Sequence, residues 1–149
     1  MNLKKVMPVI RMAQDIKKDV QSGTFFHVSV AIKGGAIIEY AFNDYNKRHP
    51  YYKFGVYKPT KTKALKNGYK PCLHAEVCLI KKLLNSDYRF KMHKLTVVNI
   101  RINNRGELAM SAPCPNCTKQ LIKYNFRRVF FTTGDPDKPI AQLKFLRQI

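Results

Sequence analysis

Two short motifs in this chain combine residue types that suit metal chemistry. One is His74-Ala75-Glu76, and the other is a Pro-Cys-Pro-Asn-Cys stretch at residues 113–117. Zinc accepts imidazole nitrogen and thiolate sulfur, and a catalytic zinc site uses three protein ligands while a water takes the fourth position. Cys114 and Cys117 are three residues apart, so both sulfurs can reach one metal from the first turn of a helix. We therefore predict that His74, Cys114 and Cys117 bind Zn²⁺.

Glu76 is the candidate for proton transfer at this site. It follows His74 by two residues and is a poor fourth ligand if the open position is kept for water. It is better placed to take a proton from that water and to deliver it to a reacting group. The alternative is a closed structural zinc site in which Cys72 or Cys78 is the fourth ligand, although we expect Cys78 to be a core residue.

Both motifs are predicted to open helices, and this position has an electrostatic consequence. The first turn of a helix presents unpaired N–H groups and a partial positive charge. Such a charge lowers the pKa of a cysteine thiol and favours the thiolate that binds a metal.

The elements that must position these residues follow from hydrophobic periodicity and turn signals. Residues 141–149 are predicted to form a short C-terminal helix. Residues 107–111 are predicted to run back briefly after the strand at residues 95–103. Helices alternating with strands predict an α/β fold, with a mixed sheet of about five strands and helices on both faces. The expected helices are 3–21, 74–85, 115–124 and 141–149, and the expected strands are 25–32, 36–42, 95–103 and 128–133.

Residues 43–73 differ from the rest of the chain. They hold eight basic residues, one acidic residue and six aromatic residues, and three prolines interrupt them. We expect a long loop here, and loops of this length are usually functional.

The bulk composition favours one intracellular domain over residues 1–149. A net charge of +19 attracts polyanions such as nucleic acid or other phosphate-bearing partners. No apolar run is long enough to cross a membrane, and we expect no membrane association and no signal peptide. Four cysteines without an export signal favour metal binding over disulfides. A cytoplasmic location is therefore expected, and the small, lysine-rich chain would suit a phage.

Taken together, the two motifs resemble the signature of zinc deaminases, H-x-E followed by P-C-x-x-C. The chain is similar to the cytidine and deoxycytidylate deaminase superfamily from about residue 25 to 133, and most similar to its His-Cys-Cys branch. The resemblance implies a three-layer α/β/α cytidine-deaminase-like fold and a zinc-dependent hydrolase. Members of the family form several kinds of homo-oligomer, so a homo-oligomer is also considered.

The resemblance also implies four substrate-binding residues. Residues 43–50 resemble a family element that ends in Lys-Thr-His-Pro, with Arg48 in place of the usual threonine. By this likeness Asn43 would bind the sugar or base edge and His49 would lie near the sugar or phosphate. The Ala75 backbone N–H would hold the base carbonyl, and the Ser111 carbonyl would accept from the exocyclic amine. His27 and His93 are expected to have no special role.

Three substrate hypotheses follow. A (deoxy)cytidine nucleotide, whose cytosine becomes uracil, is ranked first, because small single-domain relatives often have that role. A polynucleotide, either single-stranded DNA or RNA including tRNA, is second, since lysines in the 43–73 loop could track a backbone while tyrosines stack on bases. A catalytically silent nucleic-acid binder is ranked third, because a protein that only binds has no need of Glu76 for proton transfer.

Overall fold

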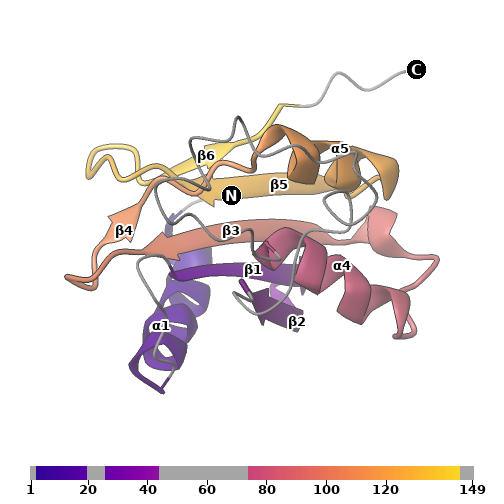
Figure 1. Cartoon of the computed structure of the whole chain (residues 1–149), viewed down its shortest axis with the longest axis horizontal. Helices are drawn as coiled ribbons and strands as arrows, with labels where there is room; N and C mark the ends of the chain where they lie inside the picture. Colours follow the sequence, from indigo (N-terminus) through magenta and orange to yellow (C-terminus); the bar gives the residue numbers. More distant parts are fainter. Residues whose placement is uncertain (1–2, 20–25, 44–73, 145–149) are drawn as a thin grey trace, which may run out of the picture.

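The computed structural model describes residues 3–19, 26–43 and 74–144, and all structural statements below concern these residues (Figure 1). Three helices and six strands follow one another along the described residues: α1 (Leu3–Asp19), β1 (Phe26–Lys33), β2 (Ala36–Phe42), α4 (Ala75–Leu84), β3 (Thr96–Ile102), β4 (Leu108–Ala109), α5 (Pro115–Lys123), β5 (Arg128–Thr132) and β6 (Ile140–Gln142). A short 3₁₀ helix, η1 (Met92–Lys94), precedes β3.

The sheet is mixed, as the sequence predicts. Its strand order is β2-β1-β3-β5-β6, and the short β4 pairs with the end of β3. Only the β3–β5 pair is parallel among the described strands. Gly34 and Gly35 connect β1 to β2 with φ values of 58° and 82°. A two-residue hairpin turn with both φ values positive favours glycine, so this turn explains the Gly-Gly pair.

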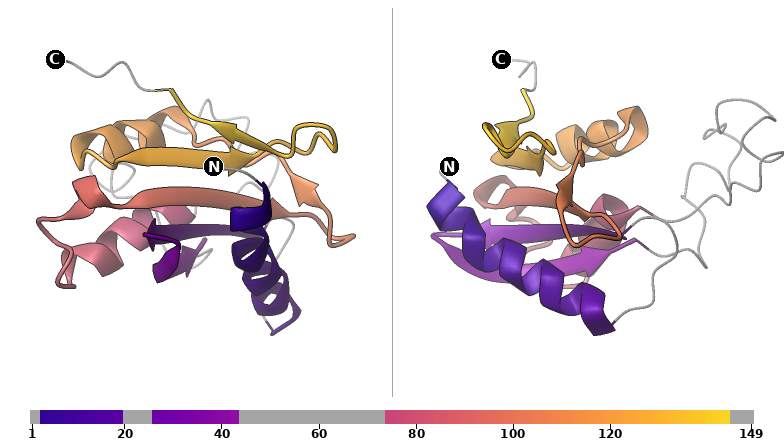
Figure 2. Two further views of the ribbon diagram at one scale, coloured as in Figure 1. Left: turned by 180° about the vertical axis from the view of Figure 1, so that it is seen from behind. Right: turned by 90° about the vertical axis from the view of Figure 1, so that its left-hand side faces the viewer.

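Helices cover both faces of the sheet, which confirms the predicted layers. On one face α1 places the apolar stripe Val6, Val9, Ile10 and Ala13 against side chains of β1 and β3. On the other face α4 and α5 bury their apolar sides against Ala31, Val97 and Val129, among others. Figure 2 shows α1 on its side of the sheet, and Figure 1 shows α4 and α5 on the other. Because β3 is covered on both faces, five of its seven residues are buried.

The predicted C-terminal helix over residues 141–149 is wrong for the part of it that the structure describes. Ile140–Gln142 instead form strand β6, which runs antiparallel to β5 with Thr132 opposite Ile140. The exposed N–H and C=O groups of an edge strand favour pairing with a following segment. Residues 145–149 lie outside the described part of the chain.

No helix among the described residues is both long enough and apolar enough to cross a membrane.

Candidate metal centre

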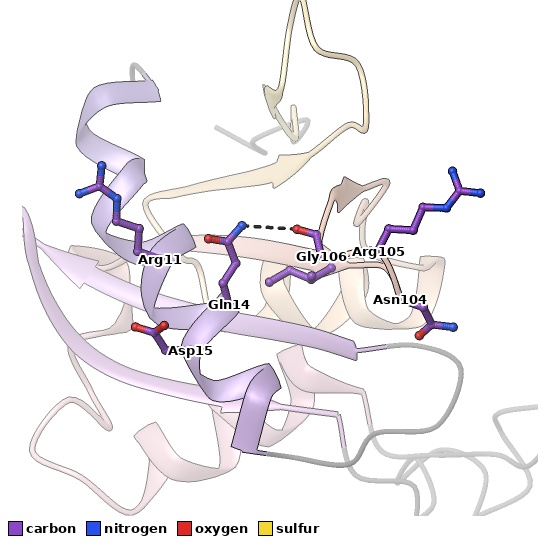
Figure 3. Close-up of a pocket in the computed structure, with 7 residues that line it drawn as sticks. Arg11, Gln14, Asp15, Asn104, Arg105 and Gly106 are labelled. Atoms are coloured by element: carbon purple, nitrogen blue, oxygen red, sulfur yellow. Dashed lines mark hydrogen bonds between the residues drawn. The ribbon is translucent and has the colours of Figure 1, made fainter.

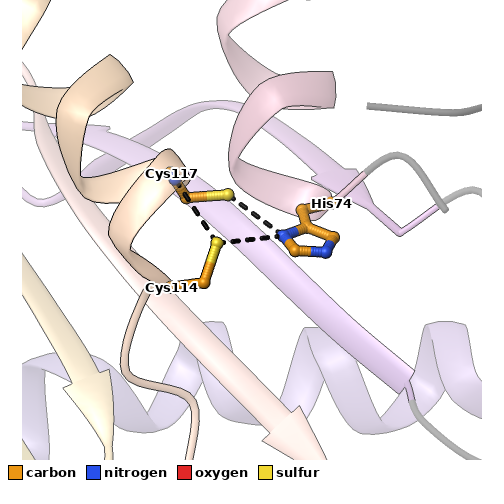
Figure 4. A group of neighbouring side chains, drawn as sticks. All are labelled: His74, Cys114 and Cys117. Carbon is orange, nitrogen blue, oxygen red and sulfur yellow. Dashed lines mark hydrogen bonds between the residues drawn. The ribbon is translucent and has the colours of Figure 1, made fainter. Parts of the chain in front are cut away.

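The N-terminal ends of α4 and α5 face each other, and both predicted motifs lie there (Figure 4). His74 is the N-cap residue of α4 and has an extended backbone, with φ −69° and ψ 153°. Cys114 is the N-cap of α5, and Pro115 occupies a position in the first turn, where a missing N–H costs little. The backbone N–H of Cys117 donates to Cys114 Sγ at 3.4 Å. Each motif is therefore held by the start of its own helix.

The three predicted zinc ligands come together at this point. His74 Nδ1 lies 3.2 Å from Cys117 Sγ and 3.5 Å from Cys114 Sγ. One ligand atom from each residue lies within 4.8 Å of the other two. Tetrahedral zinc with ordinary Zn–N and Zn–S bond lengths separates such a nitrogen and sulfur by about 3.6 Å. The donor set and its spacing therefore fit a zinc ion.

Of the two cysteines considered as a fourth ligand, Cys78 belongs to the described residues and does not join this group. Cys78 is half-buried and packs beside the Val77 and Cys117 side chains, outside the three-residue cluster. Cys72 falls in the part of the chain that the structure does not describe, as does His49. The three protein donors found among the described residues match the ligand number of a catalytic zinc site.

The two thiols of the cluster have opposite pKa shifts. The pKa of Cys114 is lowered to about 4, chiefly because the Cys117 side chain donates to it and also because His74 lies beside it. The pKa of Cys117 is raised, since its thiol donates to Cys114 and is buried. The pKa of His74 is raised by its hydrogen bond with Cys114. The two shifts are opposite because the Cys117 thiol donates to Cys114, which favours the thiolate at Cys114 and the thiol at Cys117. The expected lowering by the helix N-termini stays a prediction.

Glu76 lies in the first turn of α4 and is only 6% exposed. Burial raises the pKa of its carboxyl group, and the nearby His74 charge opposes that shift. Its carboxyl group also hydrogen-bonds with the Cys117 side chain. A buried carboxyl beside the ligand cluster is chemically able to hold and release a proton.

The remaining predicted site residues occupy different surroundings. Asn43 is buried at the end of β2, where its Oδ1 accepts from the His27 backbone N–H at 3.1 Å. Ala75 is buried and is the first residue of α4, directly after His74. Ser111 is buried, and its hydroxyl donates to the Asn99 carbonyl at 2.8 Å. Their assigned contacts with substrate stay predictions.

Sequence reasoning missed a set of polar residues on the sheet face that carries α4 and α5. Ser29 Oγ donates to Asn99 Oδ1 at 2.7 Å across the β1–β3 pair. The Asn99 Nδ2 atom is buried and has no hydrogen-bond partner among the described residues. The pKa of His27 is lowered to about 4 by burial, with smaller contributions from the Arg101 and His74 charges. The available signal was the spacing of Asn99 and Arg101, two residues apart in a strand whose other residues, apart from Thr96, are apolar.

A separate cavity of about 580 Å³ lies between α1 and the β3–β4 turn (Figure 3). Gln14 Nε2 donates to the Gly106 carbonyl at 3.4 Å across it. Arg11 and Arg105 extend outward on opposite sides of this bond. Its lining contains no cysteine or histidine and none of the predicted site residues. This cavity is therefore separate from the His74–Cys114–Cys117 cluster.

Known structures share this fold. The chain is similar to the dCMP deaminase of the cyanophage S-TIM5, solved in complex with dCMP and dUMP, with a TM-score of 0.58 and 15% identity, over 89% of this chain and 84% of that one. It is also similar to the cytidine deaminase of Burkholderia pseudomallei, with a TM-score of 0.55 and 12% identity, over 96% and 92% of the two chains. No curated protein sequence matches the chain.

The family assignment comes from the sequence itself. Residues 4–133 match the family model of the cytidine and deoxycytidylate deaminase zinc-binding region. That match spans most of the chain and includes both metal-site motifs. The chain belongs to the cytidine and deoxycytidylate deaminase family.

Proposed function

We propose that this protein is a zinc-dependent hydrolytic deaminase that converts the cytosine of a (deoxy)cytidine nucleotide to uracil. The observation that carries the proposal is the approach of His74, Cys114 and Cys117 to within 4.8 Å of one another, with the buried Glu76 beside them. The cyanophage dCMP deaminase, which has the same fold and was solved with dCMP and dUMP, supports a nucleotide substrate.

The proposed mechanism assigns a role to each residue of the site. A zinc ion held by His74, Cys114 and Cys117 would supply Lewis-acid activation of a water molecule. Glu76 takes a proton from that water and delivers it to the ring nitrogen N3, and the oxygen of the water becomes bonded to C4. Glu76 then moves the second proton of the same oxygen to the exocyclic amine, the bond between C4 and the exocyclic nitrogen breaks, and ammonia leaves. The raised pKa of Glu76 suits a group that must both accept and donate.

Two backbone groups position the base in this proposal. The Ala75 N–H, in the first turn of α4, is among those without an intrahelical acceptor and would hold the base carbonyl. The Ser111 carbonyl would accept from the exocyclic amine. The hydrogen bonds of the Ser111 hydroxyl to the Asn99 carbonyl and of its N–H to the Thr132 carbonyl support this role, because they fix the Ser111 backbone.

The test offers purified, zinc-loaded protein dCMP, CMP, cytidine, single-stranded DNA and tRNA and measures ammonia release. The proposal predicts the fastest release from a nucleotide. Ammonia release from single-stranded DNA or tRNA alone would show that the substrate is a polynucleotide and not a free nucleotide. No release from any of them would refute the enzyme and favour a silent binder.

A further inference from the structure

The described positive charge gathers at one end of the sheet. The segment between α4 and β3 and the segment from the end of α5 to the start of β5 both lie at the right of Figure 1. Across residues 85–95 and 123–128 the only acidic residue is Asp87. We call the following six exposed side chains the basic end: Arg89, Lys91, Lys94, Lys123, Arg127 and Arg128.

Hydrogen bonds join these segments into one surface. The Arg127 backbone N–H donates to the Leu95 carbonyl at 3.0 Å, and Arg128 pairs with Thr96 in the β3–β5 ladder. The Lys94 N–H donates to the Lys91 carbonyl at 3.0 Å, which holds the 3₁₀ turn beside them. The cations therefore belong to a packed end of the sheet.

The opposite end of the sheet has a different balance. There the β3–β4 turn and residues 133–139 carry three exposed acidic side chains, Glu107, Asp135 and Asp137, against two basic ones, Arg105 and Lys138. Among the described residues charge is thus polarised along the strands. A high net positive charge alone does not explain why the cations lie mainly at one end of the sheet.

Helix dipoles account for only part of the basic end. Cations stabilise the negative C-terminal end of a helix within its last turn. Lys81 and Lys82 occupy that turn in α4, and Lys123 occupies it in α5. Lys94 is in the last turn of the three-residue helix η1, whereas Lys91 and Arg128 lie outside the last turn of every helix described. Lys91 and Arg128 therefore need another explanation.

Aromatic rings accompany the cations at this end. Phe90 is 84% exposed, and Arg89 Cζ lies 5.5 Å from its ring centroid. Lys123 Nζ lies 5.4 Å from the ring of Tyr124. Single-stranded nucleic acid binds where cations follow its phosphates and aromatic rings stack on its unpaired bases. A duplex keeps its bases stacked inside, so an exposed ring favours a single strand.

We propose that the basic end binds single-stranded nucleic acid at a second site, away from the metal centre. Both α4 and α5 begin at the metal cluster and end at this surface. Helices of nine and ten residues are roughly 15 Å long. A strand bound there is held by phosphate contacts and base stacking, without contact with Glu76 or the three ligands.

The test measures fluorescence anisotropy of a labelled oligodeoxythymidine of about 20 nucleotides. Thymine carries no exocyclic amine, so this probe is not a deamination substrate, and binding is independent of turnover. Lys91→Glu/Lys94→Glu is compared with Arg105→Glu/Lys138→Glu, which changes net charge equally at the opposite end. The first variant should weaken binding at least about tenfold and lower the salt slope by about 1.4, since each single-strand phosphate contact contributes about 0.7. The control variant should stay near wild type in both its affinity for the oligonucleotide and its salt slope.

Phe90 gives a second readout that does not involve charge. Phe90→Ala should weaken binding about fivefold or more, and Phe90→Tyr should restore it, because stacking on one base is worth about 1–3 kcal/mol. Circular dichroism checks that each variant is folded. Equal weakening by the two charge variants would overturn the proposal, as would displacement of the probe by excess dCMP. Binding to anionic vesicles but not to the oligonucleotide would identify a membrane surface and would also overturn it.

Discussion

Cys114 and Cys117 have opposite pKa shifts although one helical turn holds both. The pKa of Cys114 is lowered to about 4, whereas the pKa of Cys117 is raised, because its thiol donates a hydrogen bond to Cys114 and is buried. Thiolate is the form that binds a metal, so loading zinc must release the Cys117 proton. Metal affinity should therefore rise with pH.

Removal of one thiol of the cluster should remove the metal, and Cys78, which lies outside the cluster, provides a control. Cys117→Ser should lose most of its bound zinc, because two strong donors remain at the cluster. Cys78→Ser should keep about one zinc per chain, since Cys78 lies outside the group. Elemental analysis after gel filtration checks both. Equal zinc loss in the two variants would contradict the ligand assignment.

His27 should make the folded state sensitive to acid. Its folded pKa is about 4, below the unfolded value of 6.5, so the unfolded chain binds more protons between these values. The contribution of neutral His27 to the free energy of unfolding is complete above pH 6.5. It is lost as the pH falls toward 4, and the loss is at most about 3 kcal/mol. Urea unfolding of wild type and His27→Gln from pH 7.5 to 4.5 measures it.

The comparison with His27→Gln separates this effect from acid release of the metal. The free energy of unfolding of the wild type should fall relative to that of His27→Gln as the pH falls from 6.5 toward 4. Parallel curves over the whole range would show that His27 is not held neutral.

At the scale of elements, strands β1 and β3 share a buried polar contact beneath the helices of the metal centre. Ser29 and Asn99 are directly opposite in the register, and both are nearly fully buried. Their hydrogen bond is 2.7 Å long. Removal of one partner leaves the other buried and unsatisfied, which costs about 1–3 kcal/mol.

A double-mutant cycle tests this coupling. Ser29→Ala and Asn99→Ala should each lower the free energy of unfolding, and the double variant should cost less than the sum by about 0.5–3 kcal/mol. Val97→Ala with Ser29→Ala provides a nearby pair that shares no hydrogen bond. Strictly additive costs for Ser29 and Asn99 would show that the contact contributes nothing.

Most elements follow from local pattern, and the exceptions have physical reasons. The Gly-Gly turn, the apolar stripe of α1 and Pro115 in the first turn of α5 are local signals that predict their elements. Residues 141–142 are predicted as helix but belong to strand β6, because the open edge of β5, a long-range feature, decides their conformation. The clustering of His74, Cys114 and Cys117 could be predicted from residue type and spacing. The polar contacts of Asn99 and His27 depend on cross-strand register, which pattern does not fix.

At the scale of the whole molecule, the metal centre joins two helices that lie far apart in sequence. His74 comes from the start of α4 and Cys114 and Cys117 from α5. A ligand that binds only the folded state raises the free energy of unfolding. Zinc should therefore stabilise the packing of both helices on the sheet.

Metal removal should lower the melting temperature. Dialysis against a chelator should lower the Tm of the wild type by several degrees, and added zinc should restore it. Cys117→Ser should show little response to either treatment. An unchanged Tm in wild type, with zinc loss proven by elemental analysis, would mean that the metal does not link the helices.

The measurement that tests the central claim most directly follows the oxygen of water. Zinc-loaded protein is incubated with dCMP in water enriched in ¹⁸O, and the product is analysed by mass spectrometry. The account predicts dUMP that carries ¹⁸O at C4, together with ammonia, and no product from Glu76→Gln that still holds its zinc. Unlabelled product, or full activity in Glu76→Gln, would contradict it.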